Sequence, residues 1–136
     1  HPGGNLGKDL KNLNDVMHLG KKLPLAKLDE KMSKSLITMT KKSFGCIGVI
    51  NNKKQIVGII TDGDLRRTFQ SNKKFEEMSA KDIMTRNPIT IAESLNVKES
   101  LEIMNEKKIM HLVVIRDSNY LGLLHMHDLI DLGKND

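Results

Sequence analysis

The chain has 136 residues, of which 22 are Lys or Arg and 17 are Asp or Glu, so its formal charge is +5. An apolar share of 38%, together with the 10 glycines, is typical of a globular protein and excludes a disordered chain. The apolar runs are too short for a transmembrane helix, no charged-then-apolar signal peptide opens the chain, and the single cysteine, Cys46, cannot form an internal disulfide. We therefore expect one compact domain or two very small ones in a reducing compartment, the cytoplasm.

The excess of Lys and Arg over Asp and Glu raises the question of nucleic-acid binding. The sequence pI is about 9.3, but the lysines are scattered in pairs beside acids, and aromatic residues make up only 3% of the chain. Base-stacking side chains are therefore scarce, which argues against nucleic acid as the main partner. A mild positive excess suits a small anionic ligand equally well, and we keep nucleic-acid binding as the weakest alternative.

An internal repeat organises the chain. Apolar and motif residues return, in order, at offsets of 64 to 67 residues. The matched segments are 15–18 with 82–85, 23–25 with 87–89, the apolar positions Met32, Leu36 and Met39 with Val97, Leu101 and Met104, 49–50 with 114–115, and 58–65 with 122–129. Five matches nearly in register predict two copies of one unit.

Each copy predicts the same order of elements. A short extended piece is expected beside Pro24 and Pro88, followed by a helix in which apolar residues recur at i, i+4 and i+7. Two apolar runs around a polar turn then predict a hairpin, over 46–50 and 56–60 in the first copy and over 112–115 and 120–124 in the second. A last helix opens after Thr61 or His125. The prediction is β-α-β-β-α, twice: an α+β fold.

The boundaries follow from this order. Residues 1–15 lack a core pattern and are interpreted as a linker, residues 16–71 as the first unit, 72–81 as a connector and 82–134 as the second unit. Ser79 and Asp82 have capping-box spacing and predict a short helix that carries Ile83 and Met84. Such small units bury too little surface alone, so we expect them to pack side by side about a pseudo-twofold axis, with a cleft between them. The eight methionines and Cys46 are interpreted as core and interface residues.

The most specific signal lies where the last strand of each copy meets its helix. The segments GIITDGDLRR (58–67) and LLHMHDL (123–129) occur with HPGGNLG (1–7) and with Met17-His18-x-Gly20. The repeated unit with Gly-h-h-Thr-x-x-Asp at its end resembles a tandem pair of CBS domains. The four segments together resemble the C-terminal part of bacterial arabinose 5-phosphate isomerases, over the whole chain.

This resemblance implies a regulatory region. Family members carry an N-terminal sugar isomerase domain of roughly 200 residues, which we expect to be absent from this chain. That domain would interconvert ribulose 5-phosphate and arabinose 5-phosphate, which feeds 3-deoxy-manno-octulosonate (Kdo) and thus lipopolysaccharide or capsule. His1 matches a family active-site position of the missing domain, but a lone terminal His cannot isomerise a sugar. We expect no catalytic residue in this chain.

Thr61 and Asp64 admit two interpretations. Thr61 ends a strand and Asp64 follows three residues later, so the pair can be a capping box and nothing more. The same geometry can bind a ligand, because helix-start N–H groups attract phosphate and an ionised carboxylate accepts hydrogen bonds from a ribose diol. The resemblance implies the second role. Gly63 is unfavourable in a helix and suggests a close approach of backbone or ligand.

The neighbouring residues extend both interpretations. Adjacent helical residues point about 100° apart, so one of Arg66 and Arg67 can bind an anion while the other is solvated or meets a partner subunit. In the second copy His125 replaces the Thr and His127 precedes Asp128, which departs from the family pattern and puts a standard adenosine nucleotide in doubt. A metal site is the alternative, but no Cys or Glu cluster completes the ligands.

The predicted ligand-binding set comprises Thr61, Asp62, Asp64, Arg66, Arg67, His18, Thr85, Pro88, His111, His125, His127 and Asp128. The expected ligand is a small nucleotide-type anion: CMP or CMP-Kdo by the logic of the pathway, or an adenosine nucleotide. No metal, catalytic cofactor, membrane or nucleic-acid partner is expected. The alternative is a purely structural module that drives oligomerisation as a homodimer of CBS pairs, within a tetrameric parent.

Overall fold

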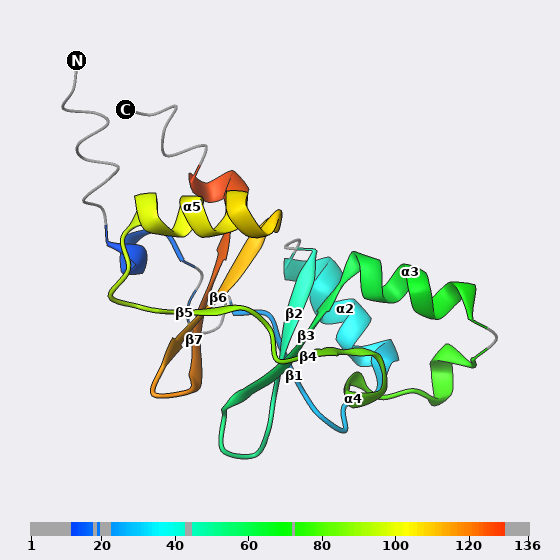
Figure 1. The fold of residues 1–136 in the computed structure, drawn as a ribbon. Helices are drawn as coiled ribbons and strands as arrows, with labels where there is room; N and C mark the ends of the chain where they lie inside the picture. Colours follow the sequence, from blue (N-terminus) through cyan, green and yellow to red (C-terminus); the bar gives the residue numbers. More distant parts are fainter. Residues whose placement is uncertain (1–11, 18, 20–22, 43–44, 72, 130–136) are drawn as a thin grey trace. The chain divides into compact units, whose positions relative to one another are not determined.

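The computed structural model describes residues 12–17, 19, 23–42, 45–71 and 73–129. His1 and His18 lie outside the described residues. The elements, labelled in Figure 1, are η1 (Leu13–Asp15), β1 (Leu25–Lys27), α2 (Met32–Lys42), β2 (Cys46–Ile50), β3 (Ile56–Thr61), α3 (Asp62–Gln70), η3 (Phe75–Glu77), α4 (Ala80–Ile83), β4 (Thr85–Arg86), β5 (Thr90–Ala92), α5 (Val97–Lys107), β6 (His111–Arg116) and β7 (Asn119–His125). The predicted order β-α-β-β-α is confirmed in both copies. Among the described residues, no helix has the length and apolar character needed to cross a bilayer.

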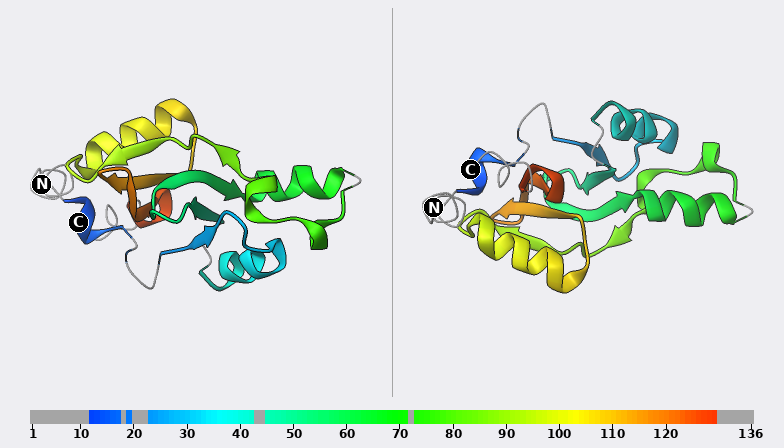
Figure 2. Two further views of the ribbon diagram at one scale, coloured as in Figure 1. Left: turned by 90° about the horizontal axis from the view of Figure 1, so that it is seen from below. Right: turned by 90° about the horizontal axis from the view of Figure 1, so that it is seen from above.

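The described residues form two compact units. The first, called here the β1–β4 unit, comprises those between 21 and 88 together with 117–120. Its sheet has the order β1-β2-β3-β4, in which β1 is parallel to β2 and the other pairs are antiparallel. Figures 1 and 2 show α2 alongside β1 and β2, and α3 continuing from the end of β3. The core between helices and sheet includes Met32, Met39, Ile47 and Ile60.

The second, called the β5–β7 unit, comprises the described residues up to 19 together with 89–116 and 121–129. Its sheet has the order β5-β6-β7, with β5 parallel to β6. Asp117 and Ser118 join β6 to β7, and both have positive φ (51° and 71°), as a two-residue type I′ hairpin requires. The periodic face of α5 is buried on this sheet through Val97 and Met104.

The compact units of the structure are not the two sequence repeats. Each consists of the body of one repeat and the opening segment of the other. Ser79, which opens the second repeat, bridges to Lys31 of the first, and Asn12 bridges in the same way to Asn96. Leu13, inside the predicted linker, is fully buried with the second half.

A glycine in each half accommodates this exchange. A Cβ at Gly58 on β3 would lie 2.4 Å from the sulfur of Met84, and a Cβ at Gly122 on β7 would lie 2.5 Å from the sulfur of Met17. The two methionines occupy matching positions at the starts of the two repeats. Each therefore fills a notch in the opposite repeat that only glycine leaves open.

Candidate functional site

The end of β3 is closed by a capping box, as the sequence predicts. Thr61 has extended backbone angles (φ −115°, ψ 171°) and its Oγ1 accepts a hydrogen bond from the Asp64 N–H at 3.3 Å. The Asp64 carboxylate accepts in return from the Thr61 N–H at 2.9 Å. Two backbone donors at the start of α3 are thereby satisfied.

Asp64 also connects three elements, in addition to capping the start of α3. Its side chain is only 5% exposed, and both of its carboxylate oxygens accept two hydrogen bonds. Besides the Thr61 N–H and hydroxyl, the donors are Thr85 Oγ1 at 2.7 Å and Arg67 Nη2. Because Thr85 belongs to β4, Asp64 connects the end of β3, the first turn of α3 and the opening strand of the next repeat. Donors therefore satisfy both oxygens of this buried carboxylate.

The two arginines have different surroundings. Arg67 is 68% exposed along its side chain, yet its guanidinium reaches back one turn to Asp64. Arg66 is exposed. The approach predicted at Gly63 is made by side chains, since a Cβ there would lie 3.4 Å from Arg67 Nη1 and 3.5 Å from Thr61 Oγ1. Arg67 is thus paired with an internal carboxylate, and the prediction that one of the two arginines binds an anion stays untested.

Cys46 lies beside this cluster at the start of β2, in register with Thr61. Burial, and secondarily the negative charge of Asp62, raises the pKa of the Cys46 thiol from 9.0 to about 12. The thiol is therefore neutral and unreactive at ordinary pH, and the prediction of a core cysteine is confirmed. Asp62 itself is exposed at the first position of α3.

The end of β7 carries imidazoles at the matching positions. His125 Nδ1 accepts a hydrogen bond from the backbone N–H of His127 at 3.1 Å, so His125 caps the helical turn over 126–129 as Thr61 caps α3. The His127 ring stacks on the His125 ring, with centroids 4.8 Å apart and an interplanar angle of 7°. His111, at the start of β6, meets His125 edge-on at 5.9 Å.

The structure brings most of the predicted residues into these two clusters. Asp128 is half-buried directly after His127, and Thr85 joins Asp64, whereas Pro88 lies partly buried beyond β4. His18 lies outside the described residues, so its role in ligand binding stays a prediction. Within the described part of the chain, no group of three His, Cys, Asp or Glu side chains is arranged to hold a metal ion.

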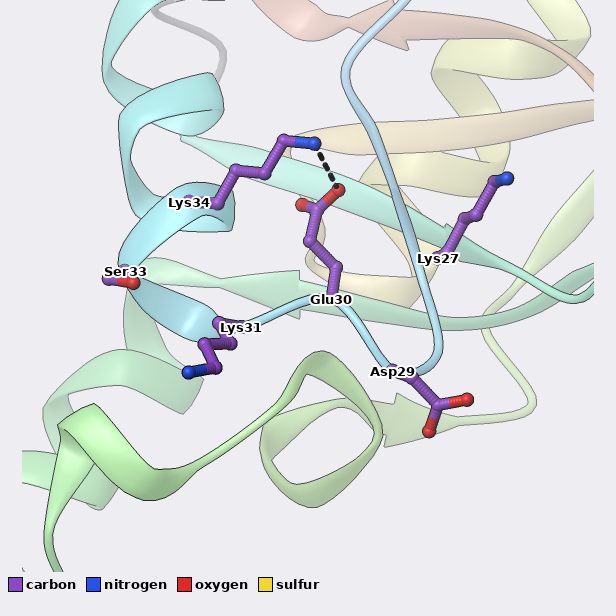
Figure 3. A pocket seen from close by; sticks show the side chains of 6 residues that line it. All are labelled: Lys27, Asp29, Glu30, Lys31, Ser33 and Lys34. Carbon is purple, nitrogen blue, oxygen red and sulfur yellow. Dashed lines mark ion pairs between the residues drawn. The ribbon is translucent and has the colours of Figure 1, made fainter.

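A hollow of about 430 Å³ lies elsewhere in the β1–β4 unit, at the start of α2 (Figure 3). Its lining is charged and mixed in sign: Lys27, Asp29, Glu30, Lys31, Ser33 and Lys34. Glu30 is engaged, because Ser35 donates to it at 2.6 Å and Lys34 lies 3.9 Å away. Asp29 pairs with Lys81 at 2.7 Å. None of the predicted site residues lines this hollow, which is an open groove between paired surface charges.

Sequence reasoning missed one anchoring residue. Tyr120, from the second hairpin, packs its ring against Gly48 and donates its hydroxyl hydrogen to the Pro24 carbonyl at 3.0 Å. A Cβ at Gly48 would lie 2.4 Å from that ring. Nothing in the local pattern indicates this contact between positions 72 residues apart. The Gly58–Met84 and Gly122–Met17 contacts had a signal, because glycine and methionine both recur in the matched segments.

The chain contains two β-α-β-β-α repeats. In each repeat the last strand runs through a capping side chain into a helical turn that contains an Asp, and this is the architecture of a tandem CBS pair. The CBS domain model matches residues 14–71 and 80–135, and the chain belongs to that family. The fold is also that of CBSX2, solved in complex with AMP, with a TM-score of 0.77 and 21% identity over 91% of this chain and 96% of that one.

Among curated proteins, the chain is similar to the arabinose 5-phosphate isomerases KdsD of two bacteria. It is 36% identical to that of Escherichia coli K12 over 134 residues and 37% identical to that of Pseudomonas aeruginosa over 135 residues. In both cases the match covers 98% of this chain and 41% of the relative. The chain thus spans about two fifths of the length of these relatives.

Proposed function

We propose that this CBS pair is the regulatory, ligand-binding part of a cytoplasmic arabinose 5-phosphate isomerase, and that its effector is a nucleotide-type anion, CMP or CMP-Kdo. The parent protein would interconvert ribulose 5-phosphate and arabinose 5-phosphate for Kdo and surface polysaccharide. Support for the parent activity comes from the KdsD relatives, which match over nearly the whole of this chain.

One observation carries the ligand-binding proposal: the buried Asp64 carboxylate gathers Thr61, Thr85 and Arg67 at the start of α3. Helix starts favour phosphate, and a carboxylate with hydroxyl neighbours favours a ribose. The AMP complex of CBSX2, a protein of the same fold, supports a nucleotide as the class of ligand.

The geometry also implies how a ribose would enter. Asp64 already accepts four hydrogen bonds, so a ribose hydroxyl must replace one of the donors. The Arg67 side chain is 68% exposed, so water can solvate its guanidinium once it leaves the carboxylate. Once displaced, its guanidinium can bind the phosphate in a bidentate manner. Arg67 would therefore exchange its internal carboxylate for the ligand's anion.

The histidines at the end of β7 offer a different set of hydrogen-bond donors from the one at the end of β3. Thr61 has one hydroxyl, whereas His125 and His127 present two stacked rings with His111 at their edge. A charged imidazole donates to a phosphodiester or a carboxylate, and CMP-Kdo carries both groups. These donors therefore support a phosphodiester or a carboxylate as the group bound at the end of β7, and CMP-Kdo provides both.

Calorimetry on the chain with CMP, CMP-Kdo, AMP and ATP tests this proposal. We expect the cytidine compounds to bind and Arg67→Ala to weaken that binding by about tenfold or more, as loss of a charge-assisted contact does. Arg66→Ala is the matched control, because Arg66 is the adjacent exposed arginine on the same helix. No binding by either cytidine compound at millimolar concentration would reject the proposal.

Binding of an effector to this chain does not by itself show that the effector regulates the isomerase. If the effector changes the isomerase activity of the whole protein, the two sites share a coupling free energy, which for binding is reciprocal. The measurement is the isomerase rate of the full-length protein with and without CMP-Kdo, compared with that of its Arg67→Ala variant. A response that the variant retains in full would place the effector at another site.

A second function, oligomerisation, is favoured by exposed apolar side chains on two helices. Ile37 on α2 is 56% exposed, and Phe69 on α3 is 60% exposed although its ring packs 5.0 Å from that of Phe75. In this alternative the pair forms homodimers without a physiological ligand. Sedimentation of Ile37→Ser and Phe69→Ser variants, alongside nucleotide titration, separates the two functions.

A further inference from the structure

Residues 78–86 open the second repeat, pack on the β1–β4 unit and are called here the strap. They contain α4 and then β4, which lies beside β3 (Figure 1). Three backbone hydrogen bonds tie the first half of the strap to residues 28–32: from the Met32 N–H to the Met78 carbonyl at 3.0 Å, from the Ala80 N–H to the Glu30 carbonyl at 2.9 Å, and from the Lys81 N–H to the Leu28 carbonyl at 3.0 Å. This half is therefore held by main-chain contacts away from Asp64.

The second half of the strap has a shorter attachment to the sheet. β4 has only two residues, both exposed, and it pairs with β3 at Gly58 and Ile59. A short ladder with exposed hydrogen bonds opens easily unless side chains hold it. Two side chains do so here. Met84 fills the notch at Gly58, and Thr85 donates its hydroxyl hydrogen to Asp64 Oδ1 at 2.7 Å.

The two oxygens of the Asp64 carboxylate have different partners. Oδ2 accepts from the N–H and the hydroxyl of Thr61, within the capping box. Oδ1 accepts from Thr85 on the strap and from Arg67 on α3. Because a carboxylate oxygen accepts about two hydrogen bonds, a new donor at Oδ1 must take the place of one of these two. A ribose hydroxyl that displaces Arg67 would share Oδ1 with the Thr85 hydroxyl.

We infer that Thr85 fastens the strap to Asp64, and that a nucleotide bound at Asp64 keeps the strap closed. Thr85 is a positioning residue, because it and Thr61 together hold both oxygens of the carboxylate and so fix its orientation. A ligand that needs this orientation binds when the strap is closed and shifts the opening equilibrium toward the closed form. The ligand in this inference rests on the proposed function, whereas the attachment of the strap does not.

Hydrogen exchange of the ligand-free chain tests the attachment. Thr85→Val removes the hydroxyl and keeps a β-branched side chain. We expect the backbone amides of residues 84–86 to exchange about tenfold faster or more, because a hydrogen bond to a charged acceptor is lost, while those of β2 in the interior of the sheet change less.

Two further variants make this test specific. Thr85→Ser retains a hydroxyl, and its amides over 84–86 should exchange as in the wild type. Thr68→Val is the matched control, because Thr68 donates to the Asp64 main-chain carbonyl at 2.9 Å and not to the carboxylate. It should leave the exchange over 84–86 unchanged.

Hydrogen exchange in the presence of CMP tests the effect of the ligand. At a CMP concentration about ten times the dissociation constant, we expect exchange over 84–86 to slow by about tenfold, since only the closed strap binds. Thr85→Val should abolish most of this protection, because the ligand then no longer distinguishes the open strap from the closed one. Thr68→Val should keep it.

The outcomes separate the attachment from the ligand effect. Unchanged exchange over 84–86 in Thr85→Val overturns the attachment. So does an increase that is equally large in β2, which is a general loss of stability, or one that Thr85→Ser shares in full. CMP binding, measured by calorimetry, without slower exchange overturns the ligand effect and leaves the proposed function standing. If CMP does not bind at millimolar concentration, the proposed function fails and the ligand effect fails with it, while the ligand-free chain still decides the attachment.

Discussion

The end of β3 and the end of β7 occupy matching positions in the two repeats but are built from different chemistry. At β3, Thr61 caps α3 and a buried Asp64 gathers four donors. At β7, His125 provides the cap and a stacked imidazole, His127, occupies the position of Gly63. The same backbone frame thus supports a carboxylate-centred hydrogen-bond network at one end and a cluster of imidazole rings at the other.

The residues that begin the neighbouring strands β2 and β6 also differ in chemistry. Cys46 in the first half stays neutral because burial raises the pKa of its thiol, whereas the second half has His111 at the matching position. The two repeats therefore match in the positions of these side chains and differ in their chemistry.

The largest expected effect on stability is at the fixed end. Asp64→Ala removes four hydrogen bonds at once and leaves Thr61 and Thr85 donors without their buried partner. We expect the free energy of unfolding to fall by about 2 to 4 kcal/mol, measured by urea denaturation. The matched control is Asp82→Ala in the exposed capping box with Ser79, where about 1 kcal/mol or less is expected. Equal losses would show that Asp64 is an ordinary cap.

The next largest effects are expected at the glycines that the methionine side chains contact. Gly58→Ala should cost about 1 to 3 kcal/mol, because the new Cβ meets the Met84 sulfur and also the Thr85 carbonyl at 3.0 Å. Gly122→Ala meets only side chains, those of Met17 and Leu19, and should cost less. Gly63→Ala, where contacts begin at 3.4 Å, should instead stabilise α3 by up to about 1 kcal/mol. Thermal unfolding of the three variants measures this order.

Alkaline pH should destabilise the protein through Cys46. The folded pKa of about 12 lies above the unfolded value of 9.0, so the folded state keeps a proton that the unfolded state loses. Stability is unaffected below pH 9 and falls by up to about 1.4 kcal/mol for each pH unit between pH 9 and 12. Comparing the pH dependence of unfolding for wild type and Cys46→Ala isolates this contribution. A thiol that reacts rapidly with a disulfide reagent in the folded protein at pH 8 would contradict the assignment.

The smallest effect is expected at Tyr120. Tyr120→Phe keeps the ring against Gly48 and removes only the hydrogen bond to the Pro24 carbonyl. Because that carbonyl also accepts from the Gly48 N–H at 3.0 Å, it does not lose every partner. We expect a loss of about 0.5 to 1.5 kcal/mol in urea denaturation. A loss comparable with that of Asp64→Ala would mean that the hydroxyl has a role beyond this bond.

The sequence predicted what depends on local pattern. Helices α2 and α5, both hairpins and the Thr61–Asp64 capping box follow from periodicity and spacing, which are properties of a few consecutive residues. The sequence did not predict that the opening segment of each repeat packs with the body of the other repeat. That packing depends on tertiary contacts, in which Met84 lies against Gly58 and Met17 lies against Gly122. Leu13 illustrates this: one leucine in a polar stretch has no period, and only the tertiary core buries it.

For the candidate site, the sequence predicted which residues lie together but not which hydrogen bonds their side chains make. The sequence placed Thr61, Asp64, His125 and His127 together with their neighbours, because the motif recurs. The sequence did not predict that Arg67 donates a hydrogen bond to the Asp64 carboxylate or that His125 accepts one from the His127 N–H. Both bonds depend on side-chain rotamers.

We propose that each of the two strand ends binds a nucleotide-type anion. Titrating CMP into the nitrogen-15-labelled chain and following the backbone amides tests it most directly. We predict saturable shifts at residues 61–64 and 125–128, which Arg67→Ala weakens and Arg66→Ala leaves unchanged. Shifts confined to the charged hollow over 27–34, or no shifts at millimolar CMP, would contradict the claim.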